Sequence, residues 1–337
     1  MIRILTAGLA ATALAALAAC SSSSTSSGQG PVPKPKLVSA AKLSNVTLKV
    51  GDQKEGAEAR LKAAGLLKNV PYKIQWSTFT SGPPELEAVS AGAIDIGGVG
   101  NTPPIFSAAA HAKIVIVSAS QDNGAGDTIL VPKGSPIHSV TQLKGKTVGV
   151  AKGSSAHGNL LLQLKKAGMT PEDIKTSFLA PSDAYAAFTQ KRIDAWAVWD
   201  PYSAQAQVSA GARILVSGTG VANGLGFNVA SRDALADPAR NTAIRDYVMR
   251  IAKAYKWTCS HPTQWATVYA AQTGLPLKAT LLSSERSEDK PVALTSSILK
   301  SEQSLTDAFY NAKVIPTKPT FSDYVDHRFD SEIAALS

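Results

Sequence analysis

The residues in this sequence that could do chemistry are hydroxyl, amide and aromatic side chains that follow short apolar runs. Those runs look like β-strands, and in open α/β sheets a ligand lies beyond the carboxyl ends of the strands. Several of these residues also begin helices, where free N–H groups and the helix dipole favour an oxyanion. The candidate ligand-binding residues are Gln53, Thr80, Ser81, Asn101, Thr102, Gln121, Ser154, Ser155, His157, Trp199, Asp200 and Asn223. For each one alone a plain helix cap is the better interpretation, so the hypothesis depends on their joint position.

The sequence lacks the residue patterns of common catalytic, metal and nucleotide sites. It contains no HExxH or CxxC motif, and its five histidines do not have the spacing of metal ligands. Ser155 is not in a nucleophile elbow, because His157 stands where the GxSxG pattern requires its second glycine. Residues 145–147 resemble the end of a phosphate loop, but Val140 replaces its first glycine and a strand follows. We therefore expect no enzymatic activity, no cofactor and no metal site.

The stretch from Ile94 to Phe106 contains the elements that would position such groups. A short apolar run of strand type leads into Gly97, Gly98 and Gly100, which predict a turn or a close approach of another group. Asn101 or Thr102 would then cap a helix that carries prolines in its first turn. This order of strand, glycine turn and capped helix places backbone amides around a small ligand.

The same order recurs further along the chain at one constant offset. Ile94 and Asp95 correspond to Ile193 and Asp194, and the cap residue Asn101 corresponds to Asp200. We expect two similar α/β lobes, each with one helix N-terminus at the site. A single sheet built from repeated units is the alternative.

The length and the charge are those of an ordinary globular chain with two domains. The 337 residues are 44% hydrophobic and 18% charged, and the net charge of +9 is spread rather than clustered. The sequence has no basic run with interleaved aromatic residues, so we do not expect nucleic-acid binding. From the breaks near 128 and the glycine-rich stretch near 218–226, we expect lobe 1 at 46–128 plus 226–337 and lobe 2 at 129–225.

The N-terminal residues 1–19 have the pattern of an export signal. Arg3 precedes an apolar stretch too short for a comfortable membrane span, and small residues lead to Cys20. This resembles the bacterial lipoprotein box, in which the cysteine carries a lipid; an ordinary signal peptide is the alternative. Residues 20–45 are rich in Ser, Gly and Pro, which predicts a tether. With Cys20 lipidated, Cys259 has no disulfide partner, and we expect it to be a small buried residue rather than a nucleophile.

Across most of the mature chain, the sequence resembles a known family. The lipoprotein box, AGAIDIGGVGNTPPIF, LKGKTVGVAKGSSAH and IDAWAVWDPY are similar to the aliphatic-sulfonate, taurine and nitrate group of ABC-transporter substrate-binding proteins. The resemblance implies a type II periplasmic-binding-protein fold, an α/β structure of two lobes joined by two hinge crossovers. It also implies a monomer on the outer face of the cytoplasmic membrane, or in the periplasm, that passes a small oxyanion to a permease and its ATPase. An aliphatic sulfonate is the first expectation for that solute.

The resemblance leaves other functions open. The fold also handles nitrate, taurine and pyrimidine vitamin precursors, and the family often has an acidic residue where this chain has Asn101. An exported enzyme acting on a sulfonate or sulfinate is the alternative from another class. A sulfinate desulfinase of this fold has a nucleophilic cysteine near its first strand, where this chain has residues 51–53 and no cysteine. That difference favours a binding protein.

Overall fold

The computed structural model describes residues 30–54 and 56–336. Residues 1–19, Cys20 and the first part of the tether lie outside the described residues. Within the described part of the chain, no helix is long and apolar enough to cross a membrane.

The larger of the two sheets has six strands in the order β11-β4-β10-β3-β1-β2. Strand β1 is parallel to β2 and β3, whereas β10 is antiparallel to both β3 and β4. The strands are β1 (Thr47–Gln53), β2 (Lys73–Phe79), β3 (Ile96–Gly100), β4 (Ile114–Gln121), β10 (Leu225–Ser231) and β11 (Lys290–Val292). The sheet therefore combines the first part of the described chain with segments that return after residue 224.

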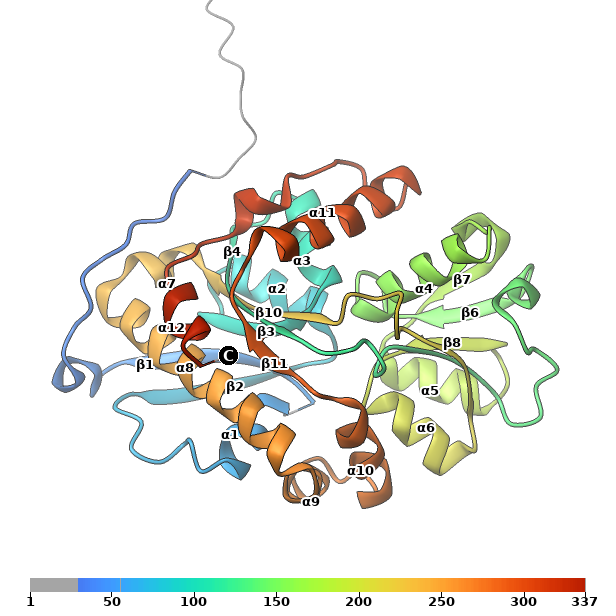
Figure 1. The fold of residues 1–337 in the computed structure, drawn as a ribbon, viewed down its shortest axis with the longest axis horizontal. Coiled ribbons are helices and arrows are strands. Elements are labelled where there is room, and N and C mark those ends of the chain that lie inside the picture. The colour runs from blue at the N-terminus through green and yellow to red at the C-terminus, as the bar shows by residue number, and fades with distance from the viewer. Residues whose placement is uncertain (1–29, 55, 337) are drawn as a thin grey trace, which may run out of the picture.

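The smaller sheet has five strands in the order β7-β6-β8-β5-β9 and is built from one continuous part of the chain. Strand β6 is parallel to β7 and β8, and β5 is antiparallel to β8 and β9. The strands are β5 (Thr128–Val131), β6 (Thr147–Val150), β7 (Lys175–Phe178), β8 (Ala195–Val198) and β9 (Arg213–Ser217). Figure 1 shows this sheet with its helices on the right of the molecule.

Helices cover both sheets. The larger lobe holds α1 (Gly56–Ala63), α2 (Gly82–Ser90), α3 (Thr102–Ala109), α7 (Arg232–Ala236), α8 (Pro238–Ser260), α9 (Pro262–Thr273), α10 (Leu277–Arg286), α11 (Ser296–Asn311) and α12 (Asp330–Ala334). The smaller lobe holds α4 (Ser155–Lys166), α5 (Pro181–Thr189) and α6 (Tyr202–Ala210). Short 3-10 helices are η1 (Ala40–Leu43), η2 (Val140–Leu143), η3 (Pro171–Asp173) and η4 (Phe321–Tyr324).

Apolar residues bury both faces of the larger sheet. Leu86 of α2, Ile105 of α3 and Phe309 of α11 are fully buried in one core. Ile244 and Tyr247 of α8 are fully buried in another core, which also holds residues of β1. Each such side chain contributes about 1.5–3 kcal/mol through removal from water.

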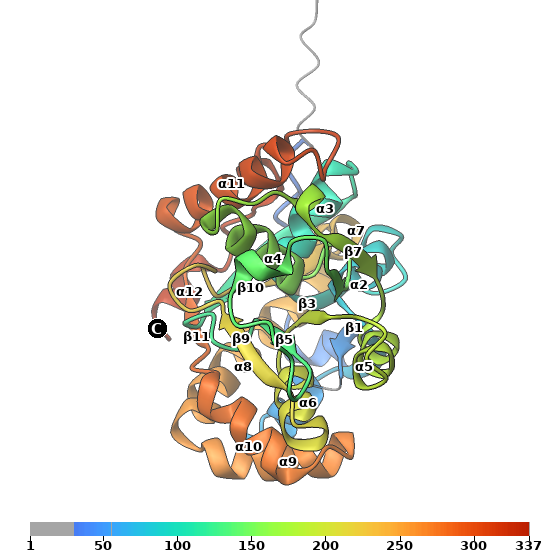
Figure 2. The same ribbon diagram turned by 90° about the vertical axis from the view of Figure 1, so that its right-hand side faces the viewer.

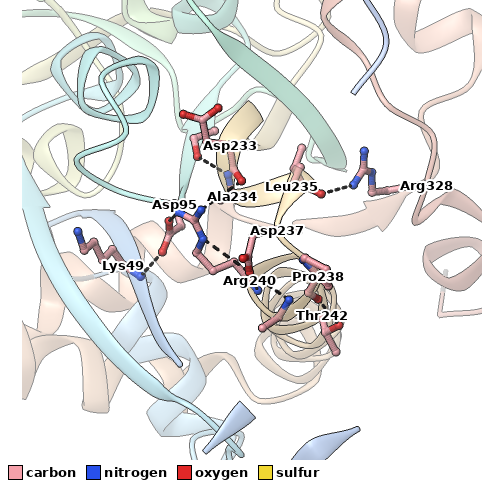
Figure 3. A network of polar contacts seen from close by, with 12 residues as sticks. Lys49, Asp95, Asp233, Ala234, Leu235, Asp237, Pro238, Arg240, Thr242 and Arg328 are labelled. Carbon is pink, nitrogen blue, oxygen red and sulfur yellow. Dashed lines mark hydrogen bonds and ion pairs between the residues drawn. The ribbon is translucent and has the colours of Figure 1, made fainter. Parts of the chain in front are cut away.

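The repeated Ile-Asp pair predicted two similar lobes, and its contacts are the same in both. The Asp95 carboxylate accepts a hydrogen bond from the Lys49 amide at 2.9 Å, and Asp194 accepts one from the Thr147 amide at 2.8 Å. Each aspartate thereby fixes the start of the first parallel strand of its sheet. Figure 3 shows Asp95 between the Lys49 amide and the Arg240 guanidinium, which lies 3.3 Å from the carboxylate.

The glycines after Ile94 do not form the turn that the sequence predicted. They lie inside β3, and none of Gly97, Gly98 and Gly100 has a positive φ. Close neighbours explain two of them: an added Cβ on Gly97 would lie 2.2 Å from Oε1 of Glu85, and one on Gly100 would lie 2.9 Å from Cβ of Ser155. The prediction of close approach holds at these positions, and the prediction of a turn is wrong.

Two connections link the sheets, one from β4 to β5 and one from β9 to β10. They are hydrogen-bonded to each other, because the Asp122 amide donates to the Gly224 carbonyl at 2.8 Å and the Gly218 amide donates to the Asp127 carbonyl at 2.7 Å. The lobes also touch through helices, since α10 contacts α6 and α11 contacts α4. Figure 2 shows these two contacts at opposite ends of the smaller lobe.

Candidate functional site

A cavity of about 280 Å³ lies between the two lobes, beyond the carboxyl ends of strands in both sheets. From the larger lobe it is lined by the ends of β1 and β3 and by residues of α1, α8 and α9. From the smaller lobe it is lined by residues that follow β8 and by the start of α4. This volume is suited to a small solute, near the lower end of ordinary ligand pockets.

Four of the candidate residues line this cavity: Gln53, Ser155, Trp199 and Asp200. The Gln53 amide donates to the buried Glu85 carboxyl at 2.8 Å and to the Gly98 carbonyl at 3.0 Å, which fixes its position. The N-cap position of α6 is Pro201, and Asp200, one residue earlier, accepts a hydrogen bond from the Ala204 amide of its first turn at 2.9 Å. Each of these contacts positions a residue within its own lobe, and the two strand ends, of β1 and β8, border the same cavity.

A second group of candidate residues is assembled away from the cavity, at the returning connection. Asn101 donates to the Asn223 side chain at 2.8 Å, and Asn223 donates to Oε1 of Glu302 at 2.6 Å. Thr102 donates to Asn101 at 2.8 Å, and Gln121 donates to the Asn223 carbonyl at 2.9 Å. Asn101 makes no side-chain cap for α3. These hydrogen bonds join the connection from β9 to β10 to α3 and α11. We call the five residues the hinge network: Asn101, Thr102, Gln121, Asn223 and Glu302.

Glu302 is the buried end of this hinge network. Its side chain is fully buried, and burial raises its pKa to about 8 against the hydrogen bond from Asn223. Its Oε2 has no hydrogen-bond partner among the described residues. At neutral pH the group is therefore held mostly as the neutral acid.

The remaining candidate residues are not among those that line the cavity. Thr80 is exposed, and Ser81 is buried at the start of α2 without a side-chain cap. Ser154 caps α4 by accepting from the His157 amide at 3.3 Å. Of these three residues, Ser154 alone makes the hydrogen bond of a helix cap.

His157 is a neutral core residue in this structure. Its ring packs between the rings of Phe106, Phe178 and Phe309, with centroid distances from 5.3 to 5.7 Å. Its Nδ1 accepts a hydrogen bond from the Gly153 amide at 3.1 Å. Burial lowers its pKa to about 4, so the imidazole is uncharged at neutral pH.

The sequence reasoning missed most of the charge in the cavity. Its walls include the carboxyl groups of Asp52, Asp122, Asp127 and Asp289 in addition to Asp200. Burial raises the pKa of Asp52 to about 6 and the pKa values of Asp122 and Asp127 to about 7. The sequence pattern predicts neutral donors for an oxyanion, and the acidic residues of the first connection lie outside that pattern.

Two guanidinium groups accompany these acids, and each is already paired. Arg60 lies on α1, 3.1 Å from Asp289, with its guanidinium 4.3 Å from the centre of the Tyr255 ring. Arg286 of α10 lies 3.4 Å from Asp200, so this ion pair joins the two lobes. Neither arginine follows a strand, because Arg60 lies in α1 and Arg286 is the last residue of α10.

No cluster of His, Cys, Asp and Glu in the described part of the chain could hold a metal ion. Cys259 lies outside the cavity and donates its thiol to the Asp289 carbonyl at 3.2 Å. Burial raises the pKa of this thiol, which disfavours the thiolate that a nucleophile needs.

Comparisons with known proteins agree with this architecture. The family model described as NMT1/THI5 like matches residues 81–265. The chain is 35% identical over 286 residues to a candidate aliphatic sulfonates-binding protein of Escherichia coli (strain K12), covering 83% of this chain and 88% of that protein. Among solved structures it is similar to the alkanesulfonate-binding protein SsuA from Xanthomonas axonopodis pv. citri bound to MOPS, with 32% identity and a TM-score of 0.76. That match covers 83% of this chain and 98% of SsuA.

A more distant structural match is the desulfurization enzyme DSZB, with 14% identity, a TM-score of 0.63, and coverage of 86% of this chain and 99% of that chain. At this identity the match shows the fold alone. The similarity to the sulfonate-binding structures confirms the α/β fold of two lobes that the repeated pattern and the family resemblance predicted.

Proposed function

We propose a function from one premise: the chain belongs to the NMT1/THI5-like family of ABC-transporter substrate-binding proteins. On that premise, the protein is the extracytoplasmic receptor of an importer and captures a small oxyanion between its lobes. An aliphatic sulfonate is the solute class that the relatives favour, because SsuA is an alkanesulfonate-binding protein seen with MOPS, itself a sulfonate. The solute would then pass to a permease that works with an ATPase.

The observation that carries this proposal is the cavity between the lobes, which Gln53, Ser155 and Trp199 line. Ser155 is the first residue of α4, whose N-terminal amides and dipole favour an oxyanion. Gln53 lines the cavity at the end of β1, and its amide hydrogens are donated to Glu85 and to the Gly98 carbonyl. The Trp199 ring, at 5.7 Å from the ring of Tyr202, would cover the alkyl part of the solute.

Closure of the lobes would accompany capture, as in other two-lobed receptors. We propose that lobe 1 consists of residues 46–128 plus 226–337 and lobe 2 of residues 129–225, with the hinge network beside the connection from β9 to β10.

We also propose that Cys20 carries a lipid and that residues 20–45 tether the lobes to the outer face of the membrane. Cys20→Ala should then move the protein from the membrane fraction to the soluble fraction, and equal membrane retention would contradict the anchor.

The experiment that tests capture is a thermal-shift screen of the protein with sulfonates, taurine, nitrate, sulfate and pyrimidines. A true solute at a hundred times its dissociation constant should stabilise the protein by about 2.7 kcal/mol. The Trp199 fluorescence should change with the same midpoint. If none of the oxyanions raises the melting temperature, the proposed function is wrong.

Two variants make the screen specific to the cleft. Ser155→Ala removes from the cavity wall a hydroxyl that donates to Asp127 at 2.9 Å while keeping the α4 amides, and should cost at most about 0.5–1.5 kcal/mol of binding. Thr80→Ala removes a hydroxyl from an exposed residue that is not among those lining the cavity and is the matched control. Trp199→Ala should weaken long-chain sulfonates more than taurine; equal losses would show that the ring only packs within its own lobe.

A further inference from the structure

A second cavity lies between the lobes, on the side where α4 contacts α11 (Figure 2). Its volume is about 410 Å³, and it shares no lining residue with the cavity described above. From the smaller lobe it is lined by the second half of α4 and by residues 169–172, and from the larger lobe by the end of α11. We call it the seam cavity, and the proposed function does not use it.

The floor of the seam cavity is apolar. Leu161 of α4 is 5% exposed and belongs to the same core as Phe309 of α11, and Ala308 is 8% exposed in that core. Met169 and Ala312 are partly exposed and continue the apolar lining, one from each lobe. An apolar chain on this floor is removed from water, which strengthens binding by about fourfold for each buried CH₂ group.

The rim of the seam cavity is cationic. Lys165 near the end of α4 and Lys313 just after α11 are exposed, and neither ammonium group has an ion pair in the described part of the chain. Glu172 is the one acidic residue of the lining. A hydrogen bond with the Thr170 side chain lowers the pKa of Glu172, and the charge of Lys313 lowers it further, so this carboxyl group is ionised at neutral pH. Two ammonium groups against one carboxylate leave a positive rim that attracts an anion.

The backbone places Lys313 at this rim. The residue follows α11 in the left-handed conformation, with a φ of 56°. Its amide donates to the Tyr310 carbonyl at 2.9 Å, and the Val314 amide donates to the Phe309 carbonyl at 3.0 Å. This is the Schellman motif, in which glycine is the commonest residue at this position, and Gly168 occupies the same position after α4. The helix end therefore accepts glycine, and the Lys313 side chain can be removed without a change of backbone.

We propose that the seam cavity binds an amphiphile with one anionic head and an apolar chain, such as a medium-chain carboxylate. The chain lies against Leu161 and Ala308, and the head lies beside Lys165 and Lys313. The volume of the cavity is within the range of ordinary ligand pockets. This second site does not depend on which solute the first cavity captures.

An occupant of the seam cavity contacts both lobes, because α4 belongs to the smaller lobe and α11 to the larger. It therefore stabilises the arrangement in which these two walls lie together. By linkage, a solute that favours the same arrangement binds more tightly when the seam cavity is occupied.

The test is isothermal titration of the full protein with octanoate, octylammonium and acetate, which separates the effect of the chain from the effect of the charge. Octanoate should bind at least about tenfold more tightly than acetate, because only octanoate has a chain to bury. It should bind about fivefold more tightly than octylammonium, whose charge has the opposite sign. The proposal is overturned if octanoate shows no saturable binding, or if octylammonium binds as tightly.

Three variants locate octanoate in the seam cavity. Lys313→Gly removes one ammonium group and should weaken octanoate by about fivefold, while the melting temperature stays within a few degrees of that of the parent protein. Glu172→Gln removes the opposing charge and should strengthen octanoate by about two- to fivefold. Ala312→Trp places a large ring in the cavity and should abolish saturable binding.

Lys191→Gly is the matched control. Lys191 also follows a helix, α5, in the left-handed conformation, with a φ of 57°, and it does not line the seam cavity. This variant should leave octanoate binding unchanged. Octanoate affinities that are equal in Lys313→Gly, Glu172→Gln and the parent protein would refute the site, even if octanoate bound elsewhere. Because the two cavities share no lining residue, that result would leave the proposed function standing.

Discussion

Replacing Arg286 with methionine should destabilise the protein through a buried ion pair that joins the lobes. The guanidinium lies 3.4 Å from the Asp200 carboxylate, and the two side chains are only 15% and 8% exposed. Methionine keeps the apolar stem and removes the charge, so Asp200 loses its cationic partner. Asp200 would retain the hydrogen bond from the Ala204 amide as its neutral contact.

The size of the effect depends on whether Asp200 stays ionised. Removing one partner of a buried pair costs about 3–5 kcal/mol, and the long contacts here favour the lower end. Burial raises the pKa of Asp200 to about 6, and Arg286 opposes that rise. In the variant the pKa rises further, and the carboxyl group can escape part of the cost by taking up a proton. We therefore expect a loss of about 3 kcal/mol near pH 8 and roughly 1 kcal/mol near pH 5.

The assay is a double-mutant cycle with Arg286→Met, Asp200→Asn and the combined variant, measured by urea unfolding at both pH values. The coupling should be about 2 kcal/mol near pH 8 and below about 1 kcal/mol near pH 5. Arg245→Met is the matched control, because its pair with Glu332 is 37% and 32% exposed and should contribute about 0–1 kcal/mol. A coupling below about 0.5 kcal/mol at both pH values, or one that does not change with pH, would refute the reasoning.

Three further outcomes follow from other contacts. Burial raises the pKa of Glu302 from 4.5 to about 8, so the folded chain keeps a proton that the unfolded chain loses, and the free energy of unfolding falls as the pH rises between these values. Glu302→Gln should reduce this fall by up to about 1.4 kcal/mol per pH unit in urea titrations. Parallel pH curves for the variant and the parent protein would contradict this. Gly97→Ala places a Cβ 2.2 Å from the Glu85 carboxyl and should cost about 1–3 kcal/mol, whereas Gly98→Ala, whose nearest neighbour is at 3.7 Å, should cost far less in the same unfolding assay. Cys259→Ser should leave ligand affinity within a few-fold by titration, and loss of a measurable turnover would instead favour the enzyme alternative.

The two-lobed fold could be predicted from the sequence because its signals are local. The Ile-Asp pair recurs at a constant offset, and each aspartate bonds to a strand amide of its own lobe. The cap Ser154 could also be predicted, because it bonds to an amide three residues later, and Asp200 bonds in the same local way to the first turn of α6. The resemblance of whole motifs to a family also predicted the two connections between the lobes.

The composition of the cavity was decided by tertiary structure. Asn101 follows a strand, as a ligand-binding residue was predicted to do, but its amide donates to the side chain of Asn223, which is far along the chain. Conversely, Arg60 and Asp289 carry no local signal and meet only because α1 packs beside the returning segment. A residue type and its neighbours in sequence determine whether a helix begins there. Which long-range partner satisfies its side chain, and whether burial shifts its charge, depend on the packing of both lobes.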